Sequence, residues 1–414
     1  MHERIGNNKK LKIECLRLKG MLNIDDIQFI REMAGCYYDT KGHKYDGHLR
    51  YLDISGATLT NTDNKEVSIY PRDPSEYEGT PWPSAEAYIN DKGTPVAIFA
   101  YLYDMEEIVL PAKLKSIGDD AFIFCRSLKS INIPESVQKI GLRAFFGCSS
   151  LKSMKLPIGI TEIKSGLLSG CTNLTSIDIP YTTEEIGHNA FSKCTSLKSI
   201  ELPYSLNNMG ISVFYGCTAL TSVTIPKNIR YINNYTFYGC TSLTSVEMPL
   251  TVTKIGNQAF YRCTALVRQD IPSNVTEIGS EAFCGCSRLI DLTIPSGIKS
   301  IGERAFSSCN SLKSIYALNP QGIGIKGKPF EEYTQSQCTL YVPEGSMYNY
   351  QCWEEWYAFN HIVEFSPTGI NGVHSAAERR EVERYDTSGR RLTSPTKGLN
   401  IVRFNDGTTR KVMK

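Results

Sequence analysis

Two residue types recur at one fixed spacing along the middle of this 414-residue chain. Nine of its fourteen cysteines repeat every 23 residues, and nine prolines from Pro111 to Pro295 keep the same step. The cysteines are Cys125, Cys148, Cys171, Cys194, Cys217, Cys240, Cys263, Cys286 and Cys309. A period of roughly 20–50 residues indicates a repeat architecture, in which each unit is one structural element stacked on the next. This period constrains the fold more than any other property of the sequence.

Alignment of the units gives the pattern L-x-x-I-x-I-P-x-x-V-x-x-I-G-x-x-A-F-x-x-C-x-x, with nine complete units from Met105 and a tenth from Leu312. The L-x-x-I-x-I stretch predicts a short strand, which the proline ends because it has no N–H to donate. V-x-x-I-G predicts a second short extended or helical segment with glycine at a turn. A-F-x-x-C then returns the chain. A single unit buries too little apolar surface to offset the entropy of ordering it, so the units must stack.

The repeat unit resembles the BspA-like leucine-rich repeat, because the I-P and A-F-x-x-C anchors recur in most units. The resemblance covers residues 105–343. It implies a mainly β fold with short helical or irregular segments. The expected architecture is a leucine-rich-repeat solenoid, a right-handed coil or arc with about ten regular 23-residue turns plus irregular capping turns. Leu167 and Leu168 depart from A-F, Met209 replaces the turn isoleucine, and Gln269 occupies an inward strand position.

The flanking segments predict caps for the two ends of the solenoid. Residues 1–60 are predicted to form an N-terminal cap with irregular turns. Within it, Asp25 or Asp26 caps a helix with Ile27, Ile30 and Met33 on one face. Residues 61–104 are a Pro-rich insertion and lead-in. Residues 344–368 are predicted to form a C-terminal cap, with Tyr348, Tyr350, Trp353, Trp356 and Phe359 covering the last turn.

Residues 369–414 differ in composition from the repeats and are predicted to form a small β-rich tail. Residues 371–414 contain ten Lys and Arg against five Asp and Glu, a net charge of +5. The stretches Y-D-T-S-G-R-R from Tyr385 and K-G-L-N-I-V-R-F from Lys397 resemble the C-terminal sorting domains of type IX secretion. The alternative is a strand-rich tail that packs on the end of the solenoid.

The recurring cysteines are predicted to be buried free thiols. Equivalent residues of stacked turns lie about 4.8 Å apart, within disulfide range, but their side chains run parallel and an odd number cannot all pair. The expected role is to fill space behind each phenylalanine. Cys15, Cys36, Cys284, Cys338 and Cys352 fall outside this period, and their spacing fixes no pairing.

The sequence contains no recognisable catalytic or metal-binding constellation. The six histidines are scattered, and His43 and His48 share a polar loop typical of a solvated surface. No G-x-S-x-G, H-E-x-x-H, phosphate-binding loop or paired C-x-x-C occurs. We therefore expect a protein that is not an enzyme and has no cofactor and no metal. The Pro-rich insertion 61–95 is the one long segment in which an unrecognised site would lie.

Charge and hydropathy limit the classes of partner and the cellular locations that the sequence predicts. A formal net charge of +2 gives no reason to expect nucleic acid, and no run of about 18 apolar residues predicts a membrane span. The N-terminal stretch has no apolar signal-peptide core. The resemblance nevertheless implies a cell-surface or secreted protein from which a signal peptide has been removed.

The best candidate for a binding surface is a row of tyrosines one period apart. Tyr215, Tyr238 and Tyr261 each follow the inward Phe and are predicted to stack in a row on the solenoid wall. The predicted patch is extended by Tyr231, Tyr235, Arg230 and Arg262. Tyrosine and arginine are enriched at interfaces. The alternative is that the tyrosine rings only cover the coil. The outward residues of the main strand, in contrast, are polar, mixed in charge and rich in small hydroxyls.

Two classes of function are compatible with these features. The first is a noncatalytic binding protein. For this class the resemblance implies adhesion to a host extracellular-matrix or surface protein, or to a glycan. The second is a structural spacer or scaffold that presents another surface component. A contiguous aromatic or charged area on one wall favours the binding protein, because a spacer needs no such area.

Overall fold

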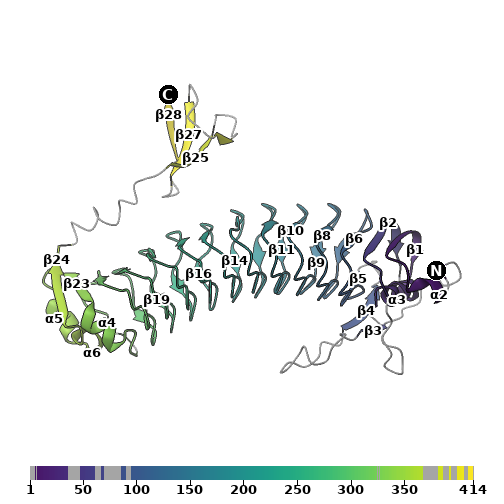
Figure 1. The fold of residues 1–414 in the computed structure, drawn as a ribbon. Helices are drawn as coiled ribbons and strands as arrows, with labels where there is room; N and C mark the ends of the chain where they lie inside the picture. The colour runs from purple at the N-terminus through teal and green to yellow at the C-terminus, as the bar shows by residue number, and fades with distance from the viewer. Residues whose placement is uncertain are drawn as a thin grey trace.

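The computed structural model is an elongated, gently curved stack of short strands with helices at both ends (Figure 1). It describes residues 5, 7–35, 47–60, 67–69, 85–89, 95–323, 325, 327–366, 381–385, 391–392, 399–404 and 409–413. The fold is mostly β with few helices, a parallel solenoid of about 11 turns. The predicted fold class is therefore confirmed.

The first wall of the solenoid is formed by the L-x-x-I-x-I strands, which pair in parallel with their equivalents one turn away. Ser153 lies opposite Ser176, and Ser222 lies opposite Ser245. Inward residues such as Ile177 and Val223 are buried, whereas their neighbours are exposed. The strands are β1 (Cys15–Leu22), β2 (Tyr51–Leu59), β6 (Glu107–Val109), β8 (Ser130–Asn132), β10 (Ser153–Lys155), β12 (Ser176–Asp178), β15 (Ser222–Thr224), β17 (Ser245–Glu247), β20 (Asp291–Ile294), β22 (Ser314–Ala317), β23 (Thr339–Pro343) and β24 (His361–Phe365).

The second wall is formed by the V-x-x-I segments, which are extended rather than helical. Each contributes a two-residue parallel strand whose isoleucine or methionine points into the core. The strands are β7 (Ser116–Ile117), β9 (Lys139–Ile140), β11 (Glu162–Ile163), β13 (Glu185–Ile186), β14 (Asn208–Met209), β16 (Tyr231–Ile232), β18 (Lys254–Ile255), β19 (Glu277–Ile278) and β21 (Ser300–Ile301). The glycine after the isoleucine is explained by close packing between turns. A Cβ on Gly279 would lie 2.5 Å from the backbone nitrogen of Asn257.

The third side, which we call the turn wall, contains the residues around each inward Phe, from 119–125 to 303–309. Its backbone also bonds from turn to turn: the N–H of Phe237 donates to the carbonyl of Ala259 at 2.8 Å. Two residues of each turn have a positive φ, as at Tyr235 (φ 59°) and Gly239 (φ 69°). Those two tight bends let each turn cross this side in a few residues while its backbone groups stay paired.

The core contains a stack of phenylalanine rings along the solenoid. Their centroids are 4.8–5.7 Å apart with nearly parallel planes. The stack runs through Phe99, Phe122 and Phe145 and then from Phe191 to Phe330. Leu168 interrupts it, because leucine replaces phenylalanine in that turn. These fully buried rings supply much of the apolar surface that holds adjacent turns together.

Each recurring cysteine donates its S–H to a backbone carbonyl 26 residues earlier, in the preceding turn. Cys240 Sγ lies 3.1 Å from the carbonyl oxygen of Phe214, and all nine contacts fall between 3.0 and 3.2 Å. Every cysteine in the described residues is free, which confirms the predicted thiols. Cys36 lies outside those residues. The nine cysteines, which we call the thiol row, thus bond adjacent turns as well as filling space.

The N-terminal end begins with α2 (Asn7–Lys10) and is covered by α3 (Ile24–Met33) (Figure 1). The buried helix face predicted for Ile27, Ile30 and Met33 is confirmed. The predicted cap was wrong: Asn23 caps the helix by accepting the N–H of Asp26, and the Asp26 carboxylate accepts the N–H of Asn23. This reciprocal pair satisfies two backbone donors at the helix start.

Residues 61–104 include an antiparallel sheet of β3 (Val67–Ile69), β4 (Ala85–Ile89) and β5 (Pro95–Val96). The repeating geometry begins in the lead-in that follows. Phe99 stacks on Phe122 at 5.3 Å, and its carbonyl accepts the thiol of Cys125. A turn of the same kind therefore precedes the first unit that the sequence pattern detects.

At the other end, α4 (Glu332–Gln337), α5 (Met347–Gln351) and α6 (Glu354–Tyr357) close the array. Trp356 and Phe359 contact Phe330, the last ring of the stack, and Tyr350 packs against Trp356. Tyr348 and Trp353 do not cover the last turn as predicted, because both side chains are exposed. A separate antiparallel sheet contains β25 (Glu381–Tyr385), β26 (Arg391–Leu392), β27 (Leu399–Phe404) and β28 (Thr409–Met413).

The side chain of Gln269 bonds to the backbone of Val246 where the first wall lacks a strand. Residues 268–270 form no strand, and only an isolated bridge joins Arg268 to Asp291. The Gln269 side chain substitutes for the missing strand: its Oε1 accepts the N–H of Val246 at 3.1 Å, and its Nε2 donates to the Val246 carbonyl at 2.8 Å. The buried backbone groups of Val246 are therefore satisfied without strand pairing.

Candidate functional site

The predicted tyrosine row exists as a continuous stack on the turn wall. The rings of Tyr215 and Tyr238 are 4.6 Å apart at 8°, and those of Tyr238 and Tyr261 are 4.7 Å apart at 11°. All three side chains are half-buried. Burial, followed by the neighbouring tyrosines, raises the pKa of Tyr238. The hydroxyl is protonated at neutral pH, as in any tyrosine, and can donate a hydrogen bond.

The four residues predicted to extend the row differ in how close they lie to it. The Arg262 guanidinium carbon lies 5.4 Å from the centre of the Tyr261 ring, and the Tyr235 ring lies 6.2 Å from that of Tyr238. Tyr231 is on β16 in the second wall, 52% exposed, and Arg230 precedes it. The described residues give Tyr231 no ring contact with the row. Tyr235 and Arg262 therefore belong to the aromatic surface, whereas Tyr231 and Arg230 lie beside it.

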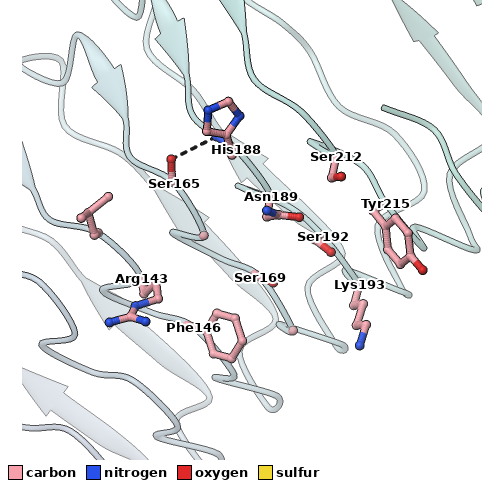
Figure 2. Close-up of a pocket in the computed structure, with 13 residues that line it drawn as sticks. Arg143, Phe146, Ser165, Ser169, His188, Asn189, Ser192, Lys193, Ser212 and Tyr215 are labelled. Atoms are coloured by element: carbon pink, nitrogen blue, oxygen red, sulfur yellow. Dashed lines mark hydrogen bonds between the residues drawn. The ribbon is translucent and has the colours of Figure 1, made fainter. Parts of the chain in front are cut away.

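A groove of about 740 Å³ opens on the turn wall immediately N-terminal to the tyrosine row (Figure 2). It exists because Ser169 and Ser192 occupy the positions that carry Phe146 one turn before and Tyr215 one turn after. Two successive small side chains therefore separate the ring of Phe146 from the ring of Tyr215. The groove was not predicted from the sequence, because its only signal there is the absence of a ring at two successive repeat positions.

Aromatic rings lie at both ends of this groove. Tyr215 has one face against Tyr238, and its other face is directed toward the turn of Ser192, where no ring follows (Figure 2). At the opposite end Phe146 lies edge-to-face on Phe124, with centroids 5.2 Å apart. The groove therefore offers flat apolar surfaces at its two ends.

The floor of the groove is polar and includes hydroxyls that the protein leaves without partners. Ser169 and Ser192 are each 6% exposed and Ser212 is 8% exposed. Within the described residues their hydroxyls make no hydrogen bond, and all three line the groove. None of these three oxygens is a buried atom without a partner, so solvent reaches them through the groove. This floor is suited to a ligand that carries its own hydroxyl groups.

His188 lies at the groove rim with its orientation fixed by the backbone. Its Nδ1 accepts the backbone N–H of Ile211 at 2.8 Å. The backbone N–H of His188 donates to Ser165 Oγ at 3.1 Å (Figure 2). Because Nδ1 accepts, the remaining ring nitrogen carries the proton in the neutral side chain and points away from that bond. The histidine is held as a hydrogen-bond donor.

The charged residues that line the groove are cationic. Arg143 donates from Nη2 to Asp120 Oδ2 at 2.8 Å, so its charge is partly neutralised. Burial raises the pKa of Asp120, and the bond to Arg143 opposes that effect. Lys193 is exposed and makes no ion pair among the described residues. No carboxylate belongs to the groove lining, so the positive charge of Lys193 dominates the charge of the groove.

The outward face of the first wall has a different character. Its side chains are exposed and polar, as predicted. The hydroxyl of Thr244 donates to the carbonyl of Thr221 at 3.0 Å, and Thr175 and Thr221 make equivalent bonds to the preceding turn. These hydroxyls are used within the solenoid, so this face has fewer free groups for a partner.

Groups that could ligate a metal are dispersed in the part of the chain that the structure covers. No group of three or more His, Cys, Asp or Glu side chains there could hold a metal ion. His43 lies outside the described residues. No helix among the described ranges is long and apolar enough to cross a membrane. The turn wall carries stacked aromatic rings, hydroxyl groups and cations.

Comparison with known proteins agrees with the type of repeat predicted from the sequence. A family model described as a BspA type leucine-rich repeat region matches residues 95–221 and 207–334. No curated protein matches the chain. Among solved structures, a leucine-rich repeat protein from Bacteroides ovatus is 26% identical with a TM-score of 0.46, and covers 77% of this chain and 92% of its own.

A leucine-rich cell surface protein from Faecalibacterium prausnitzii is 23% identical with a TM-score of 0.43, over 79% of this chain and 82% of its own. The pneumococcal vaccine antigen PcpA is 20% identical with a TM-score of 0.41, over 67% of this chain and 82% of its own.

Proposed function

The chain belongs to the family of proteins with a BspA type leucine-rich repeat region, and from this premise we propose that it is a noncatalytic binding protein, secreted or held at the cell surface. The observation that carries the proposal is the half-buried stack of Tyr215, Tyr238 and Tyr261, with Arg262 over its last ring. Pre-stacked rings lose little conformational entropy on binding, which favours their use as anchors.

The proposed role is adhesion to a host extracellular-matrix or surface protein, or to a glycan. The turn wall provides an aromatic and cationic surface that extends over several turns, as an extended partner requires. The proposal also places the C-terminal strands β25–β28, within residues 369–414, in a sorting domain of the type IX kind. The support for this placement is the sequence resemblance of the stretches that begin at Tyr385 and Lys397.

Replacing Tyr215, Tyr238 and Tyr261 together with serine is expected to weaken partner binding at least about tenfold, because hot-spot aromatics commonly contribute 2 kcal/mol or more. Serine stands at the equivalent positions 169 and 192, so the backbone tolerates it. Binding of the whole chain to fibronectin, fibrinogen and a host-glycan array would be measured by surface plasmon resonance.

The matched control replaces Tyr181 and Tyr204 with serine. These tyrosines are 57% and 70% exposed, one period apart, and follow the prolines at a different corner of the coil. The control is expected to bind as the wild type does. Equal binding by the triple variant and the wild type would contradict the proposal.

The second candidate function is a spacer or scaffold for another surface component. It is favoured by the first wall, whose threonine hydroxyls bond to the solenoid itself. A spacer needs a rigid rod and no recognition surface. Absence of binding by the wild-type chain to every partner in the set would support this function over adhesion.

A further inference from the structure

The groove between Phe146 and Tyr215 has the properties of a ligand site, and its shape defines what can enter. Along the tyrosine row a ring occurs every 4.6–4.7 Å. At residues 192 and 169 two consecutive rings are missing, and the space of about 740 Å³ is open to solvent (Figure 2). A ligand ring that packs on the free face of Tyr215 would continue the stack in the place of a side chain at residue 192.

The floor selects between an aromatic side chain of a protein partner and a sugar ring. The hydroxyls of Ser169, Ser192 and Ser212 line the groove and make no hydrogen bond to other described residues, so water solvates them when the groove is empty. A phenyl or indole ring would remove water from these hydroxyls and offer nothing in return, which is unfavourable. A pyranose has an apolar face for Tyr215 and hydroxyl groups for the serines and for Asn189. The floor therefore favours a sugar.

Charge selects the kind of sugar. The lining includes Arg143, Lys193 and the N–H donor of His188, and no carboxylate. Arg143 is already bonded to Asp120, whereas Lys193 is exposed and has no acidic partner among the described residues. A ligand carboxylate near Lys193 would gain a charge-assisted hydrogen bond that a neutral sugar cannot make.

We propose that this groove binds a carboxylate-bearing pyranose of an acidic glycan, with the sugar ring on Tyr215 and the carboxylate at Lys193. This inference rests on the proposed binding function and names the ligand class of one subsite. Uronic acids and sialic acids share this chemistry, so the probes must separate the two sources.

The test uses the full chain and isothermal titration with three probes: 3′-sialyllactose, a hyaluronan tetrasaccharide, and lactose as the uncharged counterpart of the first. At least one acidic probe is expected to bind about tenfold or more tightly than lactose. Preference for sialyllactose would identify the sialic acids, and preference for the tetrasaccharide would identify the uronic acids. Absence of any preference over lactose would overturn the proposal.

Two variants use residues that the solenoid already tolerates. Ser192→Tyr fills the groove with the residue found at positions 215 and 238 and should abolish binding of the acidic probe while the thermal unfolding temperature is unchanged or higher. Lys193→Gly introduces the residue found at the equivalent positions 216 and 239, where φ is 68° and 69° against 59° at Lys193. It should reduce binding of the acidic probe to the level of lactose. Unchanged binding by a folded Ser192→Tyr variant would overturn the proposal.

The design separates this inference from the proposed function. Ser192→Tyr keeps Tyr215, Tyr238 and Tyr261 in place, so binding of a protein partner by the row should survive it. If no oligosaccharide binds but the triple serine variant still loses a protein partner, the groove proposal fails and the binding function stands. Binding of N-acetyltyrosine amide in the absence of oligosaccharide binding would instead identify an aromatic side chain of a protein as the occupant, and would also overturn the proposal.

Discussion

Raising the pH above about 9 is expected to destabilise this protein steeply, because folding withdraws a row of thiols from water. Burial raises the pKa of eight members of the thiol row, to about 12 for Cys217 and Cys309. The buried S–H groups have no solvent to stabilise a thiolate, and each donates to a carbonyl of the preceding turn. In the unfolded chain the same thiols ionise near their ordinary value of 9.0.

The direction of the effect follows from proton linkage. Between pH 9 and about 12 the folded chain retains protons that the unfolded chain releases, so stability is fully present below pH 9 and falls as the pH rises. Each such thiol lowers the free energy of unfolding by about 1.4 kcal/mol per pH unit. Eight thiols therefore give the free energy of unfolding a limiting slope of about 11 kcal/mol per pH unit. Because a typical domain is stable by only about 5–15 kcal/mol, unfolding is expected within about one to two pH units above 9.

Urea unfolding of the protein at pH 7, 9 and 10 would measure this slope. Cys217→Ala removes one titrating thiol and is expected to reduce the slope by about 1.4 kcal/mol per pH unit. Cys352→Ser is the control, since that thiol is exposed in the folded protein and folding does not withdraw it from water. A urea midpoint that stays constant from pH 7 to pH 10 would show that the row is not buried as thiols.

The repeat period was sufficient to predict the architecture. It was not sufficient to predict whether the segments of the second wall are extended or helical. A strand of two residues, such as Ile186 with Glu185, is too short to show the alternation that identifies a strand. It is held extended by pairing with the turns on either side, and this pairing does not exist in an isolated unit. The same reason applies to Gln269, whose bonds to Val246 depend on a neighbouring turn.

The two parts of the candidate site differed in how far the sequence could predict them. Tyr215, Tyr238 and Tyr261 are large residues at one repeat position, and equal spacing was sufficient to predict that they stack. The groove depends on two small residues, Ser169 and Ser192. They lie 23 residues in sequence from Phe146 and from Tyr215, respectively, whose rings are at the two ends of the groove. Its floor also includes Ser212, which comes from another repeat position. Small residues also stand at this repeat position as Cys284 and Ser307, so the sequence alone does not distinguish the groove from other turns.

The thiol row and the phenylalanine stack together explain why the unit keeps A-F-x-x-C. The phenylalanine supplies the apolar surface between turns, and its carbonyl accepts the cysteine of the following turn. The two tight bends on either side of this segment place successive turns close enough for both contacts. Side chains outside this set, such as those at residues 192 and 215, are free to differ, so recognition surfaces can change without loss of the coil.

Replacing Phe260 with alanine is expected to reduce the free energy of unfolding by about 3–5 kcal/mol, the usual cost of truncating a buried phenylalanine. Its side chain is fully buried, and its ring lies 5.3 Å from that of Phe237 and 4.8 Å from that of Phe283. Alanine would remove both stacking contacts and leave a cavity in the middle of the array. The constrained backbone of adjacent paired turns cannot collapse to fill that cavity.

Phe260→Leu is the matched variant, because Leu168 occupies the equivalent position between Phe145 and Phe191. It should cost about 1–2 kcal/mol, since leucine restores most of the volume but not the ring stacking. Urea unfolding monitored by circular dichroism would give both values. If alanine and leucine destabilise the protein equally, the stack acts through ring contacts rather than volume; if neither destabilises it, the rings do not hold the turns together. We expect the free energy of unfolding to be much lower with alanine than with leucine, and slightly lower with leucine than with phenylalanine. This order would identify packing volume as the main source of stability between turns.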